Sequence, residues 1–126
     1  MDSEEKIEKQ QILWDNLNEN NTLREVQKYI ENQNIVREFE NESVQDRMLL
    51  LTEEIGELAK AIRKNSTNMC TDVNKQYSYD TVESEIADCF YVLTSIASTL
   101  NIDMFKSLKD KEEENIHRTW KKREAK

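Results

Sequence analysis

The sequence contains no proline and only one glycine among its 126 residues. Tight turns depend on these two residue types, so their scarcity argues against sandwiches, barrels and Rossmann-type folds. Two cysteines, Cys70 and Cys89, are too few for a disulfide framework. No apolar run approaches the roughly 20 residues needed to cross a bilayer. The first ten residues, MDSEEKIEKQ, are too charged for a secretory signal. We therefore expect a cytoplasmic protein with free thiols.

Positive charge is also scarce, since 18 Lys and Arg residues stand against 26 Asp and Glu residues, for a net charge of −8. This balance argues against nucleic acid or an anionic membrane as the main partner. Charged residues make up 35% of the chain, which is typical of helices with solvated outer faces. The length fits one domain with a modest core, which oligomerisation would help to stabilise. Composition thus predicts an all-α protein.

Caps and apolar spacing predict five helices. The first runs from about Ser3 to Glu19 and is only weakly amphipathic. The second starts at a Thr-x-x-Glu capping box at Thr22 and has apolar positions towards Phe39. The fifth starts at the cap Asp103 and continues to Trp120.

Two longer helices lie between them, each with a regular apolar seam. Ser43 is the expected cap of the first, with Asp46 in its first turn, and Asp80 with Glu83 is the expected cap of the second. The polar, aperiodic residues 65–79 that separate them form a loop of a length that is often functional. The seams step by 4, 3, 4, 3 and 4 residues, through Val44, Met48, Leu51, Ile55, Leu58 and Ile62, and through Val82, Ile86, Cys89, Leu93, Ile96 and Leu100.

Acidic residues stand beside both seams. Glu54 and Glu57 each precede a seam residue of the first long helix, and Glu85 and Asp88 do the same in the second. Acids three residues apart share a helix face, so antiparallel packing of the seams would place both pairs along one groove. Such carboxylates either splay into water as an ordinary solvated face or hold a hard cation such as Mg²⁺ or Mn²⁺. Gly56, in mid-helix, suggests the close approach of a backbone or a ligand.

The acids follow a pattern that resembles the MazG-like all-α nucleoside triphosphate pyrophosphohydrolases. That family carries E-E-x-x-E, a gap, and then E-x-x-D, which stand here at 53–57 and 85–88. A third element is similar to the family's K-x-x-x-N-x-x-R ending and consists of Lys111, Asn115 and Arg118. The likeness runs from about Val44 to Trp120. We therefore expect a MazG-like domain at 21–126 and an extra N-terminal helix at 1–20.

The resemblance implies both a reaction and a set of residue roles. It implies hydrolysis of the α–β phosphoanhydride of (d)NTPs to (d)NMP and pyrophosphate, in the clearing of nucleotide pools. Glu54, Glu57, Glu85 and Asp88 would hold Mg²⁺, with Mn²⁺ as a substitute. Glu53 would orient or deprotonate the attacking water, and the substrate phosphates would contact Lys111, Asn115 and Arg118.

The resemblance also implies a four-to-five-helix bundle whose core is completed by a second subunit, in a homodimer or homotetramer. Some relatives carry a Tyr four residues after the aspartate of E-x-x-D, where it helps to hold the nucleoside. Here that position is Val92, and Tyr91 is expected on a different helix face. Base and sugar preference therefore stay open.

Two alternatives compete with an enzyme. One is a non-catalytic helical module that binds a partner protein, and the other is a nucleotide-sensing relative without turnover. An enzyme requires the four acids of the two helices to converge on one ion, whereas a protein-interaction module does not.

Overall fold

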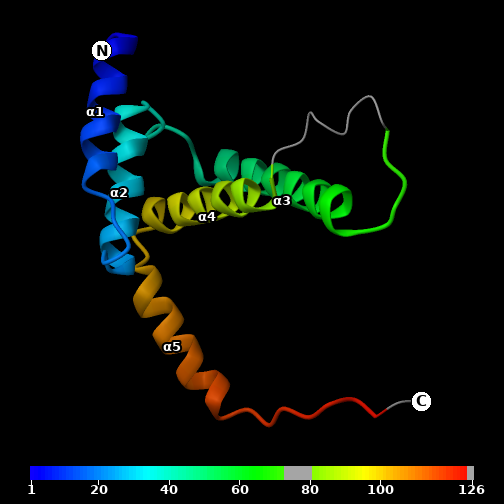
Figure 1. Ribbon diagram of the computed structural model, residues 1–126. Helices are drawn as coiled ribbons and strands as arrows, with labels where there is room; N and C mark the ends of the chain where they lie inside the picture. Colours follow the sequence, from blue (N-terminus) through cyan, green and yellow to red (C-terminus); the bar gives the residue numbers. More distant parts are fainter. Residues whose placement is uncertain (73–80, 125–126) are drawn as a thin grey trace.

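The computed structural model describes residues 1–72 and 81–124, and over those ranges it contains helices and no strand. The all-α class is thereby confirmed. The described ranges hold five helices in chain order (Figure 1): α1 (Ser3–Asp15), α2 (Leu23–Val36), α3 (Val44–Ser66), α4 (Val82–Thr99) and α5 (Met104–Ile116). Within the described ranges, none of these helices combines the length and apolar character that a membrane span requires.

Side-chain caps fix where the helices begin. The predicted capping box at Thr22 is present, and Ser43 and Asp103 cap α3 and α5 as expected. The predicted cap of α4 was wrong by one residue, because the hydroxyl of Thr81 accepts the N-terminal amide hydrogen bond at 3.2 Å. Asp80 itself lies outside the described residues.

Two helices end earlier than predicted. α1 stops at Asp15 rather than near Glu19, with Asn16 as the C-cap. Beyond it, asparagine side chains accept hydrogen bonds from the backbone amides of Asn18 and Asn20 in place of helical carbonyls. α5 stops at Ile116, four residues before Trp120, whose indole N–H instead donates to the carbonyl of Asn115 at 3.2 Å. The expected loop at 65–79 begins two residues later than predicted, because α3 continues through Ser66. Residues 73–80 lie outside the described ranges.

The helices form an antiparallel pair crossed by a second pair. α3 and α4 lie side by side along most of their length (Figure 1). α2 packs on α4 at the end where α3 begins and α4 ends, and α1 packs on α2. α5 contacts α2 and then extends away from α3 and α4. It is anchored by Asp103, which accepts from Arg24 of α2.

Only half of each predicted seam is packed within the chain. Leu51 of α3 is buried, and Leu58, Cys89 and Ile96 are partly buried in the α3–α4 contact. The alternate seam residues keep between 42% and 53% of their surface exposed. They recur every seven residues and form two parallel apolar stripes, Met48, Ile55 and Ile62 on α3 and Ile86, Leu93 and Leu100 on α4. We call this surface the open face.

Candidate metal centre

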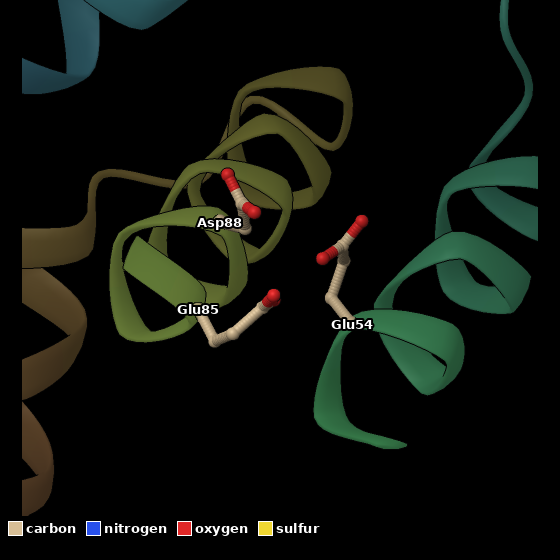
Figure 2. Close-up of side chains that lie close together, drawn as sticks. All are labelled: Glu54, Glu85 and Asp88. Atoms are coloured by element: carbon tan, nitrogen blue, oxygen red, sulfur yellow. The ribbon is translucent and has the colours of Figure 1, made fainter. Parts of the chain in front are cut away.

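Three acidic side chains from two helices converge on one point. Glu54 projects from the middle of α3, and Glu85 and Asp88 project from the first turns of α4 (Figure 2). One carboxylate oxygen of each lies within 4.8 Å of the corresponding oxygens of the other two. Glu85 is 4% exposed, Glu54 is half-buried and Asp88 is exposed, so the cluster opens to solvent on one side.

Local structure explains this convergence. Glu85 and Asp88 are three residues apart and therefore share one face of α4. The α3–α4 contact turns that face towards Glu54 (Figure 2). Glu85 also lies in the N-terminal part of α4, where the helix dipole favours negative charge.

The negative charge of the cluster acts on a neighbouring thiol. Partial burial raises the pKa of the Cys89 thiol above its usual value, and the three carboxylates raise it further. Three like charges at this separation repel one another, and a bound cation would relieve that repulsion. Because all donors are carboxylate oxygens, the set fits a hard divalent ion such as Mg²⁺ or Mn²⁺ better than Zn²⁺.

A cavity of about 220 Å³ adjoins the cluster. Glu54 and Asp88 line one end of it, so the cavity and the cluster are continuous. Its other walls come from α2, the α2–α3 connection, the N-terminal part of α3 and the C-terminal half of α4. They include Asn34, Phe39, Arg47, Tyr91 and Val92. Tyr91 thus lines the same cavity as Val92, although successive residues of a helix point about 100° apart.

A buried arginine links the walls of this cavity by hydrogen bonds. Arg47 is 5% exposed, and its guanidinium donates to the carbonyl oxygens of Ser95 at 3.0 Å and Phe39 at 2.7 Å. It also donates to the hydroxyl of Thr99, and its Nε lies 3.8 Å from the carboxylate of Glu42. These bonds join α3, the end of α4 and the α2–α3 connection, so the cavity walls are held by hydrogen bonds as well as by packing.

Sequence reasoning missed these wall residues, although a signal was present. Gln33 and Asn34 follow Ile30 at helical spacing on the apolar side of α2, and both are buried. Arg47 follows Val44 by three residues at the edge of a seam. A polar side chain in such a position must find a buried partner, which marks it for a structural network or a site.

The remaining residues singled out from the sequence lie apart from the cluster. Glu53 and Glu57 are exposed on α3, and the Glu57 carboxylate lies 3.8 Å from the ammonium of Lys60. A Cβ atom added to Gly56 would meet no atom of the described protomer within 4 Å, so close packing within the chain does not explain this glycine.

The three residues of the K-x-x-x-N-x-x-R element belong to α5 and the residues after it. Lys111 and Arg118 both bind the carboxylate of Glu114, at 3.1 Å and 2.7 Å. The side-chain oxygen of Asn115 is buried and has no hydrogen-bond partner among the described residues. α5 leads away from α3 and α4 (Figure 1), so the chain does not bring its own cations to its own carboxylate cluster.

Comparison with known proteins bears on the same region. A sequence model of the MazG nucleotide pyrophosphohydrolase domain matches residues 42–121, well over half of the chain. Searches of curated proteins and of solved structures found no significant match. The matched residues include α3, α4 and α5 and therefore every acid of the cluster.

Proposed function

The chain belongs to the MazG nucleotide pyrophosphohydrolase family, and we propose that it hydrolyses the α–β phosphoanhydride of nucleoside triphosphates in a Mg²⁺-dependent reaction. The products are a nucleoside monophosphate and pyrophosphate, and the role is the clearing of unwanted (d)NTPs. The observation that carries this proposal is the convergence of Glu54, Glu85 and Asp88 beside a cavity. A helical module that only binds another protein would not need these acids to meet.

The three clustered carboxylates would hold the metal ion, with Glu57 as a fourth ligand. Glu57 follows Glu54 by three residues on the same helix and is exposed, so its side chain has room to turn towards the ion. When bound, Mg²⁺ neutralises charge on phosphoryl oxygens and lowers the pKa of coordinated water. Members of the family are typically Mg²⁺-dependent.

The remaining groups of the site would act on the attacking water or bind the substrate. Glu53 would orient the attacking water and accept its proton, because a carboxylate is a suitable general base at neutral pH. The cavity beyond Glu54 and Asp88 would receive the nucleoside, with the phosphates directed to the cluster. In this arrangement the α–β bond would lie next to the metal ligands.

Phosphate binding by the K-x-x-x-N-x-x-R element requires a second copy of the chain. α5 contacts α2 and diverges from α3 and α4, so Lys111, Asn115 and Arg118 would serve the site of a neighbouring protomer. Arg118 suits this task, because a guanidinium can donate two parallel hydrogen bonds to two oxygens of one phosphate. The Glu114 contacts of Lys111 and Arg118 would be exchanged for phosphate contacts.

The open face supports such an assembly. Its two stripes repeat every seven residues, which is the spacing of helices that pack in a four-helix bundle. Packing the open faces of two copies together would bury both stripes and complete the core. We propose a homodimer, or a tetramer built from two dimers, as the active form.

Product analysis tests the proposed reaction. The protein is incubated with Mg²⁺ and a nucleoside triphosphate, and the products are followed by ³¹P NMR. Monophosphate and pyrophosphate in equal amounts are expected, since cleavage falls between the α and β phosphorus atoms. Diphosphate with inorganic phosphate would place the cleavage at the β–γ bond and would refute the proposed reaction.

A further inference from the structure

The cavity wall formed by Tyr91 is fixed by a chain of hydrogen bonds that leads away from the metal ligands. The Tyr91 hydroxyl donates to the side-chain oxygen of Asn34 at 2.7 Å, and Asn34 donates to the hydroxyl of Ser95 at 2.9 Å. Both Tyr91 and Asn34 line the cavity that Glu54 and Asp88 close at one end. The position of the Tyr91 ring therefore sets the shape of the space next to the carboxylates.

Arg37, the C-cap residue of α2, also holds Tyr91. Its Nη1 donates to the Tyr91 hydroxyl at 2.8 Å, and its guanidinium carbon lies 5.3 Å from the centre of the Tyr91 ring. Because the hydroxyl oxygen accepts from Arg37, its own proton is directed to Asn34. Burial raises the pKa of Tyr91, so the hydroxyl stays protonated and able to donate at neutral pH.

Arg37 is in turn held by α1. Its Nε donates to the side-chain oxygen of Gln10 at 2.7 Å. The Gln10 side chain is itself held, because its Nε2 donates to the backbone carbonyl of Lys6 at 3.1 Å. The backbone carbonyl of Gln10 accepts from the buried side chain of Gln33 at 3.1 Å, which ties α1 to α2 at this point. A long arginine side chain has many rotamers, and a bond at Nε in addition to one at Nη1 fixes the plane of the guanidinium.

We propose that α1 is a positioning element of the nucleoside pocket, in which Gln10 orients Arg37 and Arg37 orients Tyr91 against the bound nucleoside. This inference rests on the proposed function, since it takes the cavity as the nucleoside site. α1 precedes the matched residues 42–121, so the family pattern itself does not supply this contact. Gln10 and Arg37 are positioning residues, and only Tyr91 would touch the substrate.

The test compares Gln10→Ala with Gln11→Ala, two truncations of neighbouring glutamines on one helix. The exposed Gln11 side chain donates to the carboxylate of Asp15, within α1 itself, and serves as the control. Steady-state pyrophosphate release with Mg²⁺ is measured over a range of nucleotide concentrations. We expect Gln10→Ala to raise KM about 3- to 10-fold, the range that corresponds to one hydrogen bond, with kcat within about twofold. Gln11→Ala should match the wild type.

A double-mutant cycle between Gln10→Ala and Tyr91→Phe distinguishes a positioning role of Gln10 from a role in packing α1. Tyr91→Phe removes the hydroxyl that Arg37 binds, which is the last contact in the series from Gln10 through Arg37 to Tyr91. Adding Gln10→Ala to Tyr91→Phe should therefore raise KM no further. Gln10→Glu keeps the acceptor for Arg37 and should restore a KM close to that of the wild type. Thermal unfolding of each variant checks that the helices remain folded.

The outcomes distinguish this inference from the proposed function. If the wild-type protein releases no pyrophosphate from any nucleotide, the proposed function fails and the inference fails with it. If the wild type is active and Gln10→Ala leaves KM unchanged, the inference alone is refuted. Independent, multiplying effects of Gln10→Ala and Tyr91→Phe would also refute it, because α1 would then act through general stability.

Discussion

Glu54 on α3 and Asp88 on α4 place carboxylate oxygens within 4.8 Å of each other and line the same cavity. The two residues are far apart in sequence and meet only because α3 and α4 pack antiparallel. With the buried Glu85 beside them, they concentrate negative charge next to this cavity. An acidic protein can bind a triphosphate there only if a cation inverts the local charge.

Removing one charge from this cluster should abolish turnover. We expect Glu54→Gln or Asp88→Asn to lower kcat/KM at least about 100-fold, because a metal ligand stabilises charge that develops in the transition state. The same variants should weaken Mn²⁺ binding, measured by calorimetry, without loss of helical circular dichroism. Relief of repulsion should stabilise the metal-free protein by up to about 1 kcal/mol in urea unfolding.

The matched control for these variants is Glu83→Gln, in the first turn of the same helix as Asp88. Glu83 is exposed and does not belong to the cluster. Glu83→Gln should leave kcat/KM within about twofold of the wild-type value. Full activity in either ligand variant would contradict the metal site.

The open face should govern the oligomeric state. Leu93→Lys introduces a charge in the middle of the α4 stripe, where burial against a second copy would leave it unpaired. We expect this variant to sediment as a monomer in analytical ultracentrifugation and to lose activity. Ile12→Lys, at an exposed apolar position of α1, should keep the wild-type oligomeric state. A wild-type protein that is already monomeric while fully active would contradict the proposed assembly.

Subunit mixing should reveal whether α5 acts on a neighbouring site. Glu54→Gln and Arg118→Ala are each expected to be strongly impaired, Arg118→Ala through a higher KM or a lower kcat/KM. In a mixed dimer, one site then combines an intact cluster with an intact partner α5. Random mixing should recover about a quarter of wild-type activity.

A second mixture controls for this recovery. Glu54→Gln mixed with Asp88→Asn leaves every cluster damaged and should recover nothing, because both acids come from one protomer. If the mixture of Glu54→Gln with Arg118→Ala also recovers nothing, Arg118 does not act across subunits.

The sequence predicted the main elements of this architecture because local rules dominate there. The caps at Thr22, Ser43 and Asp103 follow from short-range hydrogen bonds and were confirmed. The register of Glu54, Glu85 and Asp88 beside the apolar seams predicted that they share a groove, and the structure brings these three together.

Other features depend on contacts that spacing does not encode. An apolar seam with alternating steps of four and three residues does not show which of its members pack within the chain. Leu51 does so, whereas Leu93 stays exposed. Glu57 follows Glu54 at the same three-residue spacing that brings Glu85 and Asp88 into the cluster, yet its carboxylate lies near Lys60 instead. The series of contacts through Arg37 joins three helices, so no single stretch of sequence contains it.

The most direct test of the central claim is pyrophosphate release from a panel of eight NTPs and dNTPs, measured with Mg²⁺ and again with excess EDTA. We predict release that requires Mg²⁺, is restored by Mn²⁺ and differs among the nucleotides according to how each base and sugar fits the cavity. Release that persists in EDTA would contradict the assignment of Glu54, Glu85 and Asp88 as metal ligands. No release from any of the eight by a folded, Mg²⁺-supplied protein would contradict the proposed activity on these nucleotides.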